Sequence, residues 1–172
     1  MATKVESLEA LVHLATSKQG GNDAFCDLAF VQPEIANRIE RLTNFDVHGF
    51  RHSVGESAIR HVLNRHGDAR IELTRGQTIV TPEDFLLLPE ILANPDEIFV
   101  GNDPNVVQFC KRLGSDLLVL QEIRTGRKKL ALLSMWKRPL SAPVAPHQNA
   151  STAEASAEGE PPAPFGEQAN EF

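Results

Sequence analysis

Helical periodicity dominates the first half of the chain. An amphipathic helix is predicted over residues 4–16, where apolar residues recur every three or four positions: Val5, Leu8, Leu11, Val12 and Ala15. Thr3 and Glu6 have the spacing of a capping box at its start. A short apolar run at 28–31 is a candidate strand, and Pro33 then begins a second amphipathic helix.

A third helix is predicted between Ser53 and Gly67. Ser53 and Glu56 again have capping-box spacing, and Gly67 ends the helix. At 100° per residue the apolar residues share one face with His66, whereas His61 lies on the polar face. This helix therefore presents one histidine to solvent and one to the core.

Strand periodicity takes over in the second half of the chain. A strand is predicted at 71–73, and Thr81 followed by Pro82 and two acids predicts another helix start. Four strands follow with short turns between them: 98–100, 106–110, 117–124 and 130–136. Short connections require antiparallel neighbours. We therefore expect an α+β fold in which N-terminal helices pack on a four-stranded antiparallel β-sheet.

The last part of the chain differs in composition from the rest. Residues 140–172 are rich in Ala, Pro, Ser and Glu and contain almost no large apolar side chain. Such a segment cannot bury enough surface to offset the entropy of ordering, so a disordered acidic tail is predicted. The expected organisation is an N-terminal helix at 1–20, one domain at 21–139 and the tail at 140–172.

The net charge of −6 is unevenly distributed along the sequence. All 17 Lys and Arg residues lie at or before Arg138, and residues 111–138 hold eight of them against two acids. Such an asymmetry attracts phosphates. The alternative is that these cations solvate hairpin turns and protect sheet edges.

Several classes of protein do not fit this sequence. It has no apolar run of about 20 residues that could cross a membrane and no apolar signal peptide, so an intracellular protein without membrane contact is expected. Cys26 and Cys110 are isolated and suit reduced core thiols. His48 and His52 stand four apart, but Gly49 and the absence of companion ligands argue against a metal site.

Beyond these patterns, a series of motifs resembles a known family. The motifs are F-D-V-H-G-F, I-R-H-V-L-N-R-H-G, R-G-Q-T-I-V-T-P-E-D-F, L-P-E-I-L-A-N-P-D-E-I, Q-E-I-R and L-A-L-L-S-M-W-K. In this order they are similar to the carboxy-terminal domain of phage MuF-type minor head proteins, in the barnase/EndoU/colicin/RelE-like (BECR) nuclease group. The resemblance covers roughly residues 25–138. It implies an RNA-cleaving toxin module that needs no metal and no other cofactor.

The chemistry implied by the resemblance needs groups that move protons. A ribonuclease of this kind deprotonates the ribose 2′-hydroxyl and protonates the leaving 5′-oxygen, and histidine suits both steps. His61 is our candidate acid or base, with a solvated helix histidine as the alternative. Glu122 is expected to orient a histidine or to act as the second proton carrier. His66 is a further candidate, equally well explained as a buried histidine that closes its helix.

The same chemistry needs groups that hold the scissile phosphate. Arg124 and Lys137 match strand positions of the family and are assigned this role, because their charge is permanent at neutral pH and they offer several donors. Ser134 is expected to donate a hydrogen bond to the phosphate. Trp136 is expected to pack in the core or at the sheet edge, with base stacking as the alternative.

Two functions follow from the resemblance. The first is a phage- or prophage-encoded ribonuclease effector that acts on RNA in the bacterial host cytoplasm, with packaging in a phage virion as a further possibility. A cognate immunity protein and phage head or portal proteins are its candidate partners. The alternative is a non-catalytic virion or interaction protein that retains the nuclease fold.

Overall fold

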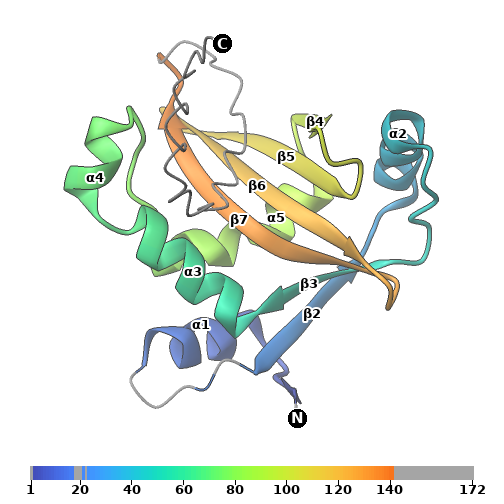
Figure 1. Ribbon diagram of the computed structural model, residues 1–172, viewed down its shortest axis with the longest axis horizontal. Coiled ribbons are helices and arrows are strands. Elements are labelled where there is room, and N and C mark those ends of the chain that lie inside the picture. The colour runs from blue at the N-terminus through green and yellow to red at the C-terminus, as the bar shows by residue number, and fades with distance from the viewer. Residues whose placement is uncertain (1, 18–20, 22, 142–172) are drawn as a thin grey trace, which may run out of the picture.

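A computed structural model describes residues 2–17, 21 and 23–141. The predicted tail lies outside the described residues from position 142 onward. The described chain has the α+β character that the sequence indicates, but its sheet is larger than expected. Figure 1 shows one long twisted sheet with helices beside it and behind it.

The predicted meander is confirmed as one part of this sheet. Its strands are β4 (Glu97–Val100), β5 (Val106–Leu113), β6 (Asp116–Thr125) and β7 (Lys129–Pro139), each antiparallel to the next. Two of the turns use left-handed backbone, at Gly114 (φ 59°) and Lys128 (φ 53°). Short connections of this kind produce antiparallel neighbours, as the sequence pattern requires.

Three further strands correct the four-stranded prediction. They are β1 (Thr3–Lys4), β2 (Ala24–Phe30) and β3 (Arg51–Gly55), and the seven strands take the order β1-β2-β3-β7-β6-β5-β4. The β3 strand runs parallel to β7, and β1 runs parallel to β2, so the sheet is mixed rather than antiparallel. The strand β3 lacks a simple alternating pattern because His52, Ser53 and Val54 are all buried.

The helices also differ in detail from their predicted bounds. They are α1 (Leu8–Thr16), α2 (Pro33–Thr43), α3 (Glu56–His66), α4 (Ala69–Thr74), the 3₁₀ helix η1 (Pro82–Leu87) and α5 (Leu88–Ala93). Ser7, not Thr3, caps α1, and its hydroxyl oxygen accepts from the Ala10 amide. The predicted Ser53 cap was wrong because Ser53 belongs to β3, and Gly55 precedes α3 instead.

Two other local predictions are settled by the structure. The segment predicted as a strand at 71–73 is helical, because Asp68 caps α4 by accepting from the amides of Arg70 and Ile71. The predicted start at Thr81 is confirmed by a capping box with Asp84.

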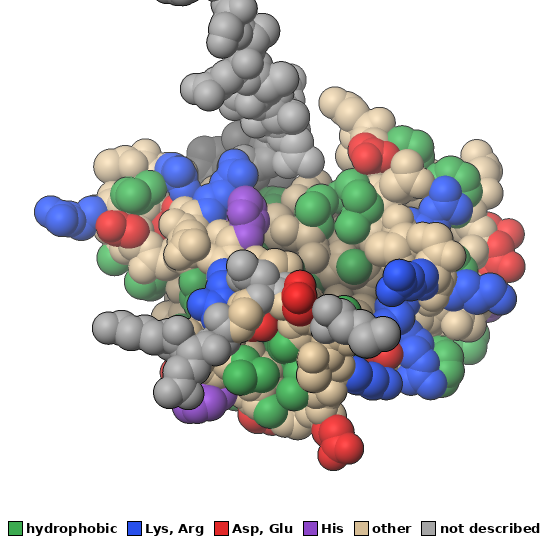
Figure 2. All heavy atoms as spheres, turned by 60° about the horizontal axis from the view of Figure 1, so that its bottom comes forward, with side chains coloured by type: hydrophobic (Ala, Val, Ile, Leu, Met, Phe, Trp, Pro, Cys, Tyr) green, Lys and Arg blue, Asp and Glu red, His purple; other side chains and the backbone are tan. Residues whose placement is uncertain are grey.

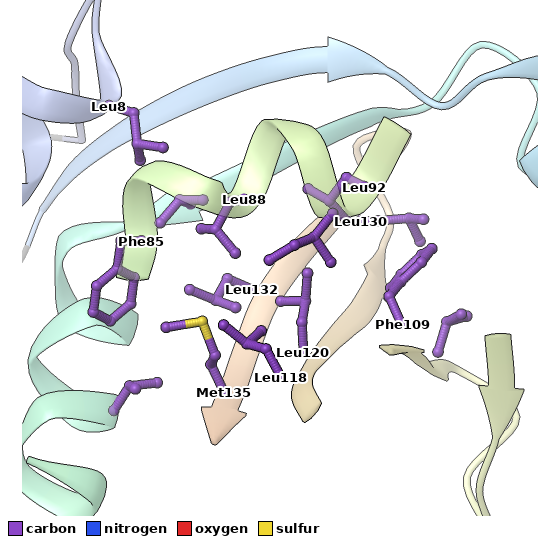
Figure 3. Close-up of a cluster of buried hydrophobic side chains, with 14 of the residues drawn as sticks. Leu8, Phe85, Leu88, Leu92, Phe109, Leu118, Leu120, Leu130, Leu132 and Met135 are labelled. Atoms are coloured by element: carbon purple, nitrogen blue, oxygen red, sulfur yellow. The ribbon is translucent and has the colours of Figure 1, made fainter. Parts of the chain in front are cut away.

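The main core lies between the sheet and the helices η1 and α5. Figure 3 shows apolar side chains from both layers meeting there, among them Phe85, Leu88, Phe109, Leu118, Leu120, Leu130 and Met135. A smaller cluster of Cys110, Val119 and Trp136 is separate from this core. Cys26 and Cys110 are unpaired thiols, and burial raises the pKa of Cys110 to about 11.

Candidate functional site

The two faces of the sheet carry different chemistry. Side chains alternate between faces along a strand, so the buried Leu118 and Leu120 of β6 share their face with Glu122. We call this the core face. Val119 and Gln121 point to the opposite face, which we call the second face. The candidate site residues divide between these two faces.

A row of four paired residues, three of them polar, crosses the second face. Phe99 of β4 pairs with Gln108 of β5, Gln108 with Gln121 of β6, and Gln121 with Ser134 of β7. The Nε2 atom of Gln121 is buried and has no hydrogen-bond partner among residues 2–17, 21 and 23–141. A buried amide nitrogen of this kind is a donor that the described residues leave unsatisfied. We call these four residues the central row.

Ser134 reaches the second face because of a bulge in β7. The register with β6 shifts between Gln121 and Glu122, so Leu132 and Met135 are both buried while Leu133 between them is 38% exposed. One extra residue reverses the alternation along the rest of the strand. This is why strand periodicity in the sequence cannot assign a face to Ser134.

Glu122 lies on the core face and is fully buried. Its Oε2 atom is 2.7 Å from Nδ1 of His52, which is also buried, and the His52 ring meets Phe109 edge-on. Burial raises the pKa of Glu122, and the nearby His52 offsets only part of that rise. The histidine that this carboxyl group contacts is His52, and both side chains are buried.

His66 is likewise held by a carboxylate. Its Nδ1 is 2.9 Å from Oε2 of the fully buried Glu72, whose other oxygen accepts from Arg75 at 2.7 Å. The His66 ring lies 6.5 Å from the Trp136 ring. His66 therefore has the surroundings of a buried histidine that joins α3 to α4 and β7.

His61 is exposed, and it forms no hydrogen bond or ion pair with any residue in the described part of the chain. The helix α3 packs beside β7, as Figure 1 shows. His61 precedes His66 by five residues, about 7.5 Å along a helix, which corresponds to about two residues along a strand. Since His66 lies near Trp136, His61 is roughly level with Ser134.

The structure does not bring Arg124 and Lys137 together. Arg124 stands opposite Leu130 and Lys137 opposite Leu118, so about 20 Å of strand separates them. Arg124 lies over the Phe45 ring at 3.7 Å and donates to Asn105 at 2.9 Å. Lys137 pairs with Asp84 at 2.8 Å. These two side chains do not converge on one phosphate here.

Lys129, which begins β7, belongs to the cation-rich segment 111–138, and the structure brings it close to Lys4 of β1. Lys129 and Lys4 both pair with Asp27, at 2.5 and 3.2 Å. Burial pushes the pKa of Asp27 upward, but hydrogen bonds from Lys129 and Lys4 outweigh it and hold the pKa below its usual value. In Figure 2, Lys and Arg side chains gather at the right, the side on which the β6–β7 hairpin lies in Figure 1.

Among residues 2–17, 21 and 23–141 there is no group of three or more His, Cys, Asp or Glu side chains able to hold a metal ion. The same residues also contain no helix that is long and apolar enough to span a membrane.

Comparison with known families adds to this geometry. The model of a family described as phage-Barnase-EndoU-ColicinE5/D-RelE like nuclease3 matches residues 29–142, more than half of the chain. The chain belongs to this nuclease family. Its matched region begins in β2 and takes in the rest of the described fold, including α3 and the central row. No curated protein and no solved structure gives a significant match.

Proposed function

We propose that the chain is a metal-independent endoribonuclease that cleaves RNA on the second face of the sheet, beside α3. The observation that carries this proposal is the exposed His61 at about the level of Ser134, in a chain of a BECR-like nuclease family. An exposed imidazole and neutral hydrogen-bond donors are groups that phosphodiester cleavage without a metal uses.

In the proposed reaction, His61 accepts the proton of the ribose 2′-hydroxyl. The 2′-oxygen then forms a bond to phosphorus, the bond from phosphorus to the 5′-oxygen breaks, and the leaving oxygen takes a proton from solvent. The products are a 2′,3′-cyclic phosphate and a 5′-hydroxyl. Ser134, which is partly exposed, donates a hydrogen bond to a phosphate oxygen as charge develops on it.

The other candidates take different roles in this proposal. Glu122 and His66 stabilise the fold through their buried partners, His52 and Glu72. Lys137 fastens β7 to η1 through Asp84, and Arg124 binds phosphates away from the scissile bond.

We also propose the biological setting that the family points to. The protein would be a phage- or prophage-encoded effector, with a domain of the MuF carboxy-terminal type, acting on RNA in the bacterial host cytoplasm. Delivery in the virion, a cognate immunity protein, and contacts with head or portal proteins belong to the same proposal.

The proposal is tested by incubating the full chain with RNA in excess EDTA. We expect cleavage with 2′,3′-cyclic phosphate ends, and no cleavage when a 2′-deoxy nucleotide replaces the ribose at the scissile position. Activity lost in EDTA and restored by Mg²⁺ would show a metal-dependent reaction instead.

A second candidate function is a non-catalytic phage virion or interaction protein. It is favoured by one observation: four predicted catalytic residues, Glu122, His66, Lys137 and Arg124, are engaged by partners within the chain. Absence of RNA turnover together with stable association with capsid or portal protein would support this alternative.

A further inference from the structure

A cluster of cations and aromatic rings lies where β2 and β3 meet the β6–β7 hairpin. We call it the hairpin-end surface, and its residues are Lys4, Phe25, Phe30, Arg51, Arg127, Lys128 and Lys129. Asp27 lies within it, and Asp46 lies near Lys128. Five cations against two carboxylates leave this surface positively charged.

Two of its cations lie over aromatic rings. The Arg51 guanidinium carbon is 3.7 Å from the Phe30 ring centre, and Lys129 Nζ is 4.4 Å from that of Phe25. Such pairs hold a long charged side chain flat against a ring. The surface therefore offers fixed positive charge directly beside aromatic faces.

The backbone sets the spacing of these groups. Phe30 of β2 pairs with Arg51 of β3, and Arg51 pairs with Lys129 of β7, so the three form a row across the strands. A register shift between Asp27 and Phe30 precedes this row, and Phe30 is 51% exposed although it is a large apolar side chain. A bulge re-aims the side chains that follow it. Arg51 covers one face of the Phe30 ring, so the rest of the exposed ring is the part that a ligand can contact.

We propose that the hairpin-end surface is a docking site for single-stranded RNA, with a base stacked on Phe30 and the backbone phosphates held by Arg51, Lys129 and the hairpin cations. Stacking on an aromatic face requires an unpaired base, whereas phosphate binding alone does not distinguish single strands from duplexes. Interleaved rings and cations therefore select a single strand. Lys129 lies five residues before Ser134 on β7, about 16 Å away, so docked RNA would continue toward the central row.

This inference concerns binding and does not depend on the proposed cleavage. The probe is a fluorescent 2′-O-methyl oligoribonucleotide, which lacks the free 2′-hydroxyl that cleavage requires. Its binding to the full chain is measured by fluorescence anisotropy at several salt concentrations. We expect Phe30→Ala to weaken single-strand binding about tenfold. We expect Arg51→Gln to weaken it and to lower the slope of log K against log salt by about one.

Matched controls come from α4, which lies across the molecule from the hairpin in Figure 1. Leu73→Ala removes a 78% exposed apolar side chain, and Arg70→Gln removes an exposed cation. Both are expected to leave binding unchanged. Thermal unfolding of all four variants checks that the fold is intact.

The outcomes separate this inference from the nuclease proposal. No binding of the probe, equal losses in the Phe30 and Leu73 variants, or a duplex bound as tightly as the single strand would overturn the docking site, whatever the cleavage assay shows. Selective loss in the Phe30 and Arg51 variants supports the docking site even if RNA is never cleaved.

Discussion

The buried pair of His52 and Glu122 links β3 to β6 through side chains alone. Their contact of 2.7 Å lies within the apolar layer that includes Phe109 and Leu120. The second carboxylate oxygen of Glu122 has no hydrogen-bond partner within residues 2–17, 21 and 23–141. A buried polar pair of this kind stabilises the fold only while both partners are present.

Glu122→Ala should therefore lower the free energy of unfolding by about 3–5 kcal/mol, because His52 is left buried without a partner. Glu122→Gln should cost less, since an amide keeps a hydrogen bond to His52 and carries no charge. Urea unfolding of the three proteins measures both values. Equal losses in the two variants would show that the contact with His52 does not stabilise the fold.

Asp27 makes stability depend on pH in the acid range. Its pKa is lower in the folded protein, so the unfolded chain binds the proton more readily. The ion pairs with Lys4 and Lys129 thus contribute stability above the unfolded pKa of about 4, and this contribution is lost as pH falls through the folded pKa.

We expect the unfolding free energy of the wild type to fall more steeply below about pH 5 than that of Asp27→Asn. Denaturant unfolding at a series of pH values between 3 and 6 provides the comparison. Parallel pH profiles for the two proteins would contradict this role of Asp27.

The helix α3 is fixed to the sheet at its C-terminal end. The carbonyl of His66 accepts from the Val80 amide at 2.8 Å, and the carbonyl of Lys137 accepts from the Thr78 amide at 3.0 Å. Gly67 ends the helix, and a Cβ atom there would lie 2.3 Å from the Leu63 carbonyl oxygen. The position of α3 beside β7, and with it that of His61, depends on this close turn.

Gly67→Ala should destabilise the protein by about 1–3 kcal/mol, because backbone must move to admit the methyl group. Gly126→Ala is the matched control, since a Cβ atom there meets nothing within 4 Å, and its effect should stay within about 0.5 kcal/mol. Thermal unfolding distinguishes the two. Equal stability of both variants would mean that the C-terminal end of α3 can adopt another backbone conformation without loss of stability.

Local signals in the sequence locate most of the helices and strands, but they do not always distinguish a helix from a strand. The meander and the start at Thr81 follow from turn residues and capping chemistry. The helix α4 was missed because Ile71 and Leu73 alternate like a strand, whereas Asp68 satisfies the helical amides. The strand β3 was missed because its polar residues are buried and give no alternating pattern. It forms by parallel pairing with β7, which lies far away in the sequence.

At the scale of the whole molecule, the residues that stabilise the fold and those proposed to act on RNA lie on different faces of the sheet. Its core face buries the large apolar side chains and the His52–Glu122 pair, and its second face carries the central row. The sequence identifies His61 and Ser134 as candidates, but it cannot reveal Gln121 or the hairpin-end surface. Those depend on strand register and on the two bulges, which no local pattern encodes.

The most direct test of the proposed active site compares two exposed helix histidines. RNA cleavage in EDTA is measured for the wild type, His61→Ala and the control His13→Ala, with thermal unfolding of each. We predict that His61→Ala lowers the cleavage rate at least a hundredfold at unchanged stability, while His13→Ala keeps the wild-type rate. Cleavage at the wild-type rate by folded His61→Ala would contradict the assignment of catalysis to α3 and the second face.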